Sequence, residues 1–223
     1  MTYKVREIEA ALTLGYTYLT LKDLPDAPSI DEDAVTFAEN ARKKALGLAQ
    51  WLAAGPIHAL RLPQAGDATY VLADDSGLEV DALGGAPGVH SARFAGLGTG
   101  HPGNASDAEN NAKLLQLLSG VASEHRTARF RCVIAATRIR HGLSQPIVGE
   151  TQLFEGACEG SILCSPRGDR GFGYDPLFVP AGYRESFAEL GDTVKNRISH
   201  RARALAGLKG FLEPPAPKRE GKG

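Results

Sequence analysis

The sequence predicts an α/β fold in which a mixed β-sheet is flanked by helices. Residues 128–139 and 146–163 are rich in β-branched and aromatic residues, which is typical of strands. Between residues 37 and 52, phenylalanine, alanine and leucine recur at helical spacing and predict an amphipathic helix. Helices and strands alternate irregularly along the chain, which favours a mixed sheet over a regular βαβ repeat.

The first half of the chain is predicted to hold two helices. Residues 4–14 carry apolar side chains at helical spacing and end before Gly15. Thr36 is the expected N-cap of the helix that follows it. Residues 51–70 contain proline and glycine and read as an exposed insertion.

The rest of the chain, from residue 70 onward, adds the strands and two more helices. The run "YVLAD" predicts a buried strand that ends at Asp74 and Asp75. Ser106 and Glu109 have the spacing of a capping box and predict the start of a helix. The strand region 146–163 is expected to turn at Gly156. A final helix is expected after a cap at Ser199.

Composition narrows the class of protein. The 223 residues include 25 Lys and Arg against 26 Asp and Glu, a formal net charge of −1, so no broad field attracts nucleic acid or an anionic membrane. The three cysteines show no CxxC spacing and read as reduced thiols. No signal peptide or membrane-spanning run is visible. We therefore expect a cytoplasmic protein with no membrane or nucleic-acid partner.

Adjacent carboxylates are the first candidate site. Asp74 and Asp75 repel one another, and burial is unfavourable for both unless positive charge lies nearby. Together with Glu39, in the first turn of a helix, they offer the hard oxygen ligands that suit Mg²⁺. Each has a simpler interpretation. Glu39 can form a capping box with Thr36, and one aspartate can initiate a turn.

Two further motifs point to a ligand. Phe172 lies between two glycines in "GFGYDP" and could offer its ring face to a planar group such as a nucleobase, although a tight turn with its aromatics in the core fits equally. Lys195, His200 and Arg201 gather donors around a helix start, where anions are favoured, although a solvated basic face is the more common explanation.

Several reaction classes have no support in the sequence. GxSxG, HExxH and paired CxxC motifs are absent, which argues against acyl transfer and zinc hydrolysis. The glycine-rich segment after Asp75 matches neither GxxxxGK[ST] nor GxGxxG. The features that still point to a site are the acidic residues, the aromatic ring of Phe172 and the cluster of hydrogen-bond donors.

Taken in order, six segments resemble the Ham1/inosine-triphosphate pyrophosphatase family: "TFAENARKKA", "LADDSGLEVDALGGAPGVHSARF", "NNAKLLQLL", "GFGYDPLFVP", "SFAEL" and "KNRISHRARAL". The resemblance covers about residues 4–211. It implies a long mixed sheet in two lobes with a nucleotide cleft between them. It also implies Mg²⁺-dependent hydrolysis of inosine, deoxyinosine and xanthosine triphosphates to the monophosphate and pyrophosphate, usually by a homodimer.

The resemblance also implies roles for individual residues. Asp75 matches the family's general base, and Glu39, Asp74 and Asp75 match its acidic metal site. The residues that match substrate contacts are Lys4, Ser76, Phe172, Gly173, Tyr174, Asp175, Lys195, His200 and Arg201. Among these, His200 and Arg201 match the pair that faces the six-position oxygen of the purine, and Lys4 matches a lysine that reaches the triphosphate.

One departure from the family pattern affects the expected domain. Family members open with a strand and a T-G-N-x-x-K loop, of which the sequence keeps only Thr2, Tyr3 and Lys4. We therefore expect residues 1–212 to form one two-lobed domain without that strand, and residues 213–223 to form a flexible tail. A nucleotide-binding protein that has lost the phosphate loop, and with it catalysis, is the alternative function.

Overall fold

A four-stranded antiparallel sheet forms the centre of the protein. The computed structural model describes residues 3–12, 16–55, 57, 69–98, 103–140 and 145–212. The strands lie in the order β1-β2-β3-β4, with bounds β1 Thr69–Val80, β2 Thr127–Arg140, β3 Ile147–Ile162 and β4 Phe178–Pro180. The predicted α/β class is confirmed.

Strand pairing differs from the mixed sheet that the sequence predicts. All three neighbouring pairs are antiparallel. The chain enters β2 beside the residue where β1 ends, with Val80 opposite Ala128, so β2 must run back along β1. β2 and β3 then follow one another directly and pair along nearly their whole length.

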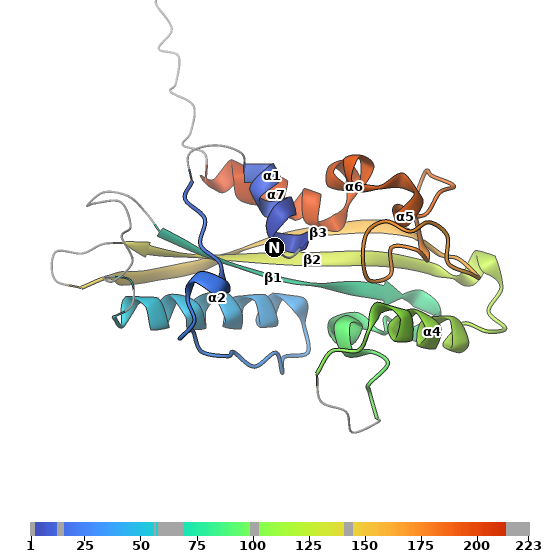
Figure 1. Cartoon of the computed structure of the whole chain (residues 1–223), viewed down its shortest axis with the longest axis horizontal. Coiled ribbons are helices and arrows are strands. Elements are labelled where there is room, and N and C mark those ends of the chain that lie inside the picture. The colour runs from blue at the N-terminus through green and yellow to red at the C-terminus, as the bar shows by residue number, and fades with distance from the viewer. Residues whose placement is uncertain are drawn as a thin grey trace, which may run out of the picture.

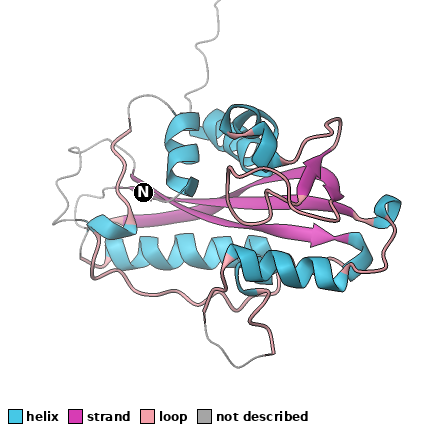
Figure 2. Ribbon diagram, turned by 45° about the vertical axis from the view of Figure 1, so that its right-hand side comes forward, coloured by secondary structure: helices cyan, strands magenta, loops and turns pink. Residues whose placement is uncertain are grey.

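Helices cover both faces of the sheet (Figure 1). One face carries α2 (Phe37–Ala53), the 3₁₀ helix η3 (Gly88–Arg93) and α4 (Asp107–Leu117). The other carries α1 (Tyr3–Leu12), α5 (Phe187–Leu190), α6 (Asp192–Ile198) and α7 (His200–Leu212). Short 3₁₀ helices η1, η2 and η4 span Leu21–Asp23, Asp81–Leu83 and Ser123–His125. Figure 2 shows the same two layers from a second direction.

Capping residues fix the starts of three helices where the sequence predicts them. Thr36 Oγ1 accepts a hydrogen bond from the Glu39 amide at the start of α2. Ser106 and Glu109 form a complete capping box on α4. Ser199 Oγ accepts from a first-turn amide of α7. Each cap satisfies a donor that the helix itself leaves unpaired.

β2 packs against helices on both of its faces. On one face Val133 and Ala135 pack with α2, and on the other Cys132, Ile134 and Ala136 pack with α7. Successive side chains of a strand point to opposite faces, so a strand buried on both sides is apolar at every position. This explains the nearly continuous apolar run at the centre of β2.

Two strand predictions are wrong. β1 does not end at Asp74 and Asp75 but continues to Val80, because Asp75, Ser76 and Gly77 all pair with β2. β3 does not turn at Gly156 but runs straight through it, opposite Cys132. In both places strand pairing outweighs a local turn signal.

Some predictions fall outside the described residues. These are the tail at residues 213–223, most of the expected insertion at 51–70, and the end of the first predicted helix, which the structure describes as far as Leu12. Within the described part of the chain, no helix is both long and apolar enough to cross a membrane.

Gly156 allows α7 to lie directly against β3. A Cβ at this position would lie 2.1 Å from the backbone oxygen of His200 and 2.7 Å from the backbone nitrogen of Ala204. Backbone atoms cannot move aside as a flexible side chain can, so any side chain here must displace the helix.

We therefore expect Gly156→Ala to lower the free energy of unfolding by about 1–3 kcal/mol, the usual cost of overpacking a core. Gly210→Ala is the matched control: Gly210 lies in α7 with no atom within 4 Å of an added Cβ, so helix propensity alone predicts a gain of up to about 1 kcal/mol. Urea unfolding of both variants measures the difference. Equal stabilities would contradict the close packing.

Candidate active site

Asp74 and Asp75 point to opposite faces of the sheet. They are consecutive residues of β1, whose side chains alternate. Asp75 pairs with Lys44 of α2, whereas Asp74 pairs with Arg201 of α7, on the other face. The structure therefore does not bring the two carboxylates together around one ion. Each has its own cation.

Asp75 is a buried carboxylate with one oxygen unsatisfied. Its Oδ1 accepts from Lys44 Nζ at 2.9 Å, while its Oδ2 is buried with no hydrogen-bond partner. Burial raises the pKa of the Asp75 carboxyl above its ordinary value, and nearby Glu32 raises it further, whereas Lys44 and the side chain of Asn40 lower it. An unsatisfied buried oxygen on a strengthened base is suited to accept a proton or bind a cation.

Glu32 is a site residue that the sequence analysis missed. Its Oε1 lies 3.2 Å from Lys44 Nζ, so one ammonium group lies between the carboxylates of Glu32 and Asp75. The neighbouring acids of the "IDED" run gave no periodic signal that could single out Glu32. Its position could only be found from the fold.

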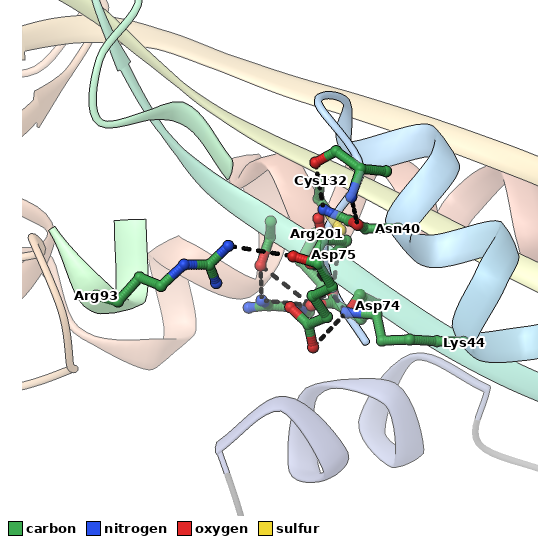
Figure 3. A network of polar contacts seen from close by, with 10 residues as sticks. Asn40, Lys44, Asp74, Asp75, Arg93, Cys132 and Arg201 are labelled. Atoms are coloured by element: carbon green, nitrogen blue, oxygen red, sulfur yellow. Dashed lines mark hydrogen bonds and ion pairs between the residues drawn. The ribbon is translucent and has the colours of Figure 1, made fainter. Parts of the chain in front are cut away.

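The side chains of Asn40 and Arg93, which lie near Asp75 in Figure 3, hold the segment that carries Glu32. Asn40, buried on α2, accepts from the Ala34 amide at 3.0 Å and donates to the Ala34 carbonyl at 3.3 Å. Arg93, at the end of η3, donates to the Glu32 carbonyl at 3.2 Å. The segment is therefore attached to helices on both sides of Asp75.

Glu39 lies in the first turn of α2, where its carboxylate accepts from the Thr36 hydroxyl at 2.9 Å and its amide donates to the same hydroxyl. These contacts belong to the start of the helix, and a place for Glu39 in the metal site stays a prediction. Within the described ranges no three His, Cys, Asp or Glu side chains are grouped closely enough to hold a metal ion by themselves. Asp75 and Glu32 still form a suitable pair, because Mg²⁺ is commonly held by one or two carboxylates together with substrate phosphates and water.

On the other face, Arg201 is the centre of a buried ion network. Its Nε donates to Asp74 Oδ2 at 2.9 Å, its Nη1 to Glu7 of α1 at 2.6 Å and its Nη2 to Ser76 Oγ at 3.0 Å. The Ser76 hydroxyl and the Cys132 thiol donate in turn to Asp74. Burial alone would lower the pKa of Arg201, but the carboxylates of Asp74 and Glu7 outweigh it and raise that pKa.

A second buried ion pair holds the loop at residues 171–175. Lys195 of α6 donates to Asp175 Oδ2 at 2.5 Å, and both side chains are almost fully buried. The same Asp175 oxygen accepts from the Phe172 amide at 2.9 Å. Lys195 Nζ lies 4.2 Å from the centroid of the Phe172 ring, within cation–π range. Phe172, Asp175 and Lys195 therefore form one unit.

Tyr174 and His200 lie in the core. The Tyr174 hydroxyl donates to the Ser91 carbonyl at 2.9 Å, and burial raises its pKa, so the phenol stays neutral. The ring of buried His200 stacks on Phe130 with centroids 4.8 Å apart. For Tyr174 the interpretation as a core aromatic is the better one.

Most of the predicted substrate contacts thus fall in two buried groups, one around Arg201 and one around Lys195. Glu7 pairs with Arg201 in the first group. Burial raises the pKa of Asp175 in the second, and the charge of Glu7 adds to that rise. Lys4 lies in the first turn of α1, and its side chain is outside the part of the chain that the structure describes.

We expect Arg201→Met to lower the free energy of unfolding by about 3–5 kcal/mol, because Asp74 and Glu7 would remain as buried charges without a cation. Adding Asp74→Asn should recover part of the loss. Arg42→Met, an exposed change on α2, is the control. Urea unfolding measures all three. An Arg201→Met protein as stable as Arg42→Met would show that the network does not hold α1 and α7 to the sheet.

Comparisons with known proteins find relatives that match nearly the whole chain. Residues 2–211 match the model of the Ham1 family. The dITP/XTP pyrophosphatase of Geobacter sulfurreducens is 49% identical over 210 residues, 94% of this chain and 91% of that protein. That of Desulforamulus reducens is 47% identical over 203 residues, 91% of this chain and 87% of that protein.

Solved structures show the same relationship. A HAM1 protein from Coxiella burnetii superposes with a TM-score of 0.73 at 34% identity, covering 95% of this chain and 94% of that one. The Ham1 protein of Staphylococcus aureus gives a TM-score of 0.73 at 33% identity, covering 94% and 92%. The chain belongs to the Ham1 family.

Proposed function

We propose that this protein hydrolyses the triphosphates of non-standard purine nucleosides (ITP, dITP and XTP) to the monophosphate and pyrophosphate, and so removes them from the nucleotide pool. The relatives named dITP/XTP pyrophosphatase support the reaction. The observation in the structure that carries it is the unsatisfied, buried Oδ2 of Asp75 beside Lys44 and Glu32.

In this proposal Asp75 is the general base. It takes a proton from the water that attacks the phosphorus. The P–O bond to the leaving pyrophosphate breaks as the new P–O bond forms. Lys44 and Arg93 lie beside Asp75 and Glu32 and supply positive charge toward the phosphates.

A divalent cation, Mg²⁺, fits the same group. Asp75 and Glu32 would hold it, with the substrate phosphates completing its ligands. When bound, it would neutralise phosphate charge and lower the pKa of the attacking water. Asp74, which the resemblance placed in the metal site, lies on the other face with Arg201, so we assign it to holding Arg201.

The nucleobase would bind at the second group of residues. Phe172 offers its ring, Gly173 and Asp175 shape the loop, and Lys195 lies over the ring. His200 and Arg201 come from the start of α7. Donors that face a six-position keto oxygen would face the amino group of adenine unpaired, at a cost of about 1–3 kcal/mol. This explains preference for inosine and xanthosine over adenosine.

Arg201 and Ser76 already donate within the protein. We therefore assign them to supporting the base site from the α7 face of the sheet, while Tyr174 anchors the loop through its hydrogen bond to the Ser91 carbonyl. Binding of the triphosphate by Lys4, the two-lobed cleft, the homodimer and the cytoplasmic location remain predictions.

We expect Asp75→Asn to reduce pyrophosphate release from ITP by about 10²- to 10⁴-fold, the usual contribution of a general base. An assay that separates pyrophosphate from orthophosphate, run on ITP, XTP and ATP, measures this. Orthophosphate as the product would contradict the reaction. ITP binding without turnover would instead indicate a nucleotide-binding protein that lacks catalysis.

Glu32 and Glu39 give a matched test of the metal site. We expect Glu32→Gln to raise the Mg²⁺ concentration needed for half-maximal rate by about tenfold or more, since one charged ligand is lost. Glu39→Gln should leave it near the wild-type value, because Glu39 caps α2. Mg²⁺ titrations of the rate in both variants measure the difference. A larger increase in Glu39→Gln than in Glu32→Gln would indicate that Glu39, and not Glu32, holds the metal.

A further inference from the structure

We infer that Asp107 and Asn111 of α4 are positioning residues that hold the loop at residues 171–175 and so set the place of the Phe172 ring. This inference rests on the proposed function, because that function assigns the loop to the nucleobase. Neither residue was among the predicted site residues. Both belong to a helix on the opposite face of the sheet from Lys195 (Figure 1).

Both backbone polar groups of Gly173 bond to the same helix. The Gly173 amide donates to Asp107 Oδ2 at 2.6 Å, and the Gly173 carbonyl accepts from Asn111 Nδ2 at 3.0 Å. Asp107 and Asn111 are four residues apart, so their side chains lie on one face of α4. A hydrogen bond to a carboxylate is shorter and stronger than a neutral one. Together the two contacts fix both the position and the rotation of Gly173.

The loop needs such a restraint because glycines lie on both sides of Phe172. Gly171 and Gly173 have φ of +82° and +61°, a region open to glycine and unfavourable for other residues. The chain at both sites has rotational freedom that a side chain would remove. Asp175 holds the loop through the Phe172 amide. Asp107 and Asn111 hold it through the backbone of Gly173, the next residue.

Packing alone does not fix the ring. A cavity of about 470 Å³ is lined by α4 and the loop together, and Phe172 forms part of its wall. The other apolar lining comes from Ala108, Ala112, Leu115, Pro166 and Pro176. On the side of the cavity no close packing holds the ring. The contact with Lys195 and the hydrogen bonds from Asp107 and Asn111 to the next residue together set where the ring lies.

Asp107 also has a structural role in α4, and its effects must be distinguished from those of positioning the loop. It lies in the first turn of α4, where an acidic side chain stabilises the helix dipole. That role predicts lower stability with unchanged substrate binding. Positioning of the loop predicts weaker binding of the base with nearly unchanged turnover, because Asp75 and Lys44 are not touched.

The test compares five full-length proteins: wild type, Asn111→Ala, Asp107→Ala/Asn111→Ala, Asp107→Asn and Gln116→Ala. Asp107→Asn keeps an acceptor for the Gly173 amide. Gln116 is exposed on the same helix and serves as the matched control. KM and kcat for ITP are measured by pyrophosphate release, and amide hydrogen exchange is measured over residues 166–176.

We expect KM for ITP to rise about three- to tenfold in Asn111→Ala and further in the double variant, as expected for lost hydrogen bonds, with kcat within about twofold of wild type. Exchange over residues 166–176 should become faster in both. Asp107→Asn and Gln116→Ala should stay close to wild type in both measurements.

Wild-type KM and exchange in the double variant would overturn the inference, as would a fall in kcat with KM unchanged. The exchange measurement uses no substrate. If the wild type releases no pyrophosphate, the proposed function fails, while exchange in the loop still decides whether Asp107 and Asn111 hold it.

Discussion

Burial of two adjacent carboxylates in one strand requires a cation on each face of the sheet. Because side chains alternate along β1, Asp74 and Asp75 cannot share a counter-ion, and each pairs with a helix on its own side. The pair with Lys44 holds α2 over one face of the sheet, and the pair with Arg201 holds α7 over the other. The electrostatic need at the centre of β1 thus determines which helix residues must lie over it, and the candidate site forms around them.

The two ion pairs differ in whether their polar atoms still lack a hydrogen-bond partner. Arg201 bonds to Asp74, Glu7 and Ser76 with all three of its nitrogens, so this group is largely satisfied. Asp75 keeps one oxygen without a partner, and Lys44 is shared with Glu32. A satisfied network favours rigidity, whereas an unsatisfied one favours reaction. This difference is why we propose the chemistry for the α2 face and a supporting role for the group on the α7 face.

The parts of the fold that depend on local chemistry could be predicted from the sequence. Caps at Thr36 and Ser106 involve residues three apart, and the two-sided burial of β2 is visible in its composition. The strand through Asp75 and Ser76 was missed because aspartate, serine and glycine favour turns locally, while pairing with β2 is a long-range effect. For the same reason Glu32 gave no signal in the sequence. Glu39 is marked by its position in a predicted helix, whereas the segment that carries Glu32 is a loop placed by contacts from Asn40 and Arg93.

The absence of a side chain at Gly156 also bears on recognition of the base. His200 and Arg201 begin α7, and the backbone oxygen of His200 is one of the atoms that lie against Gly156. The depth at which these two residues approach β1 is thus limited by a residue on a different strand that has no functional group of its own. A relative with a larger residue there would have to carry the start of this helix farther from the sheet, and would need longer side chains to span the added distance to β1.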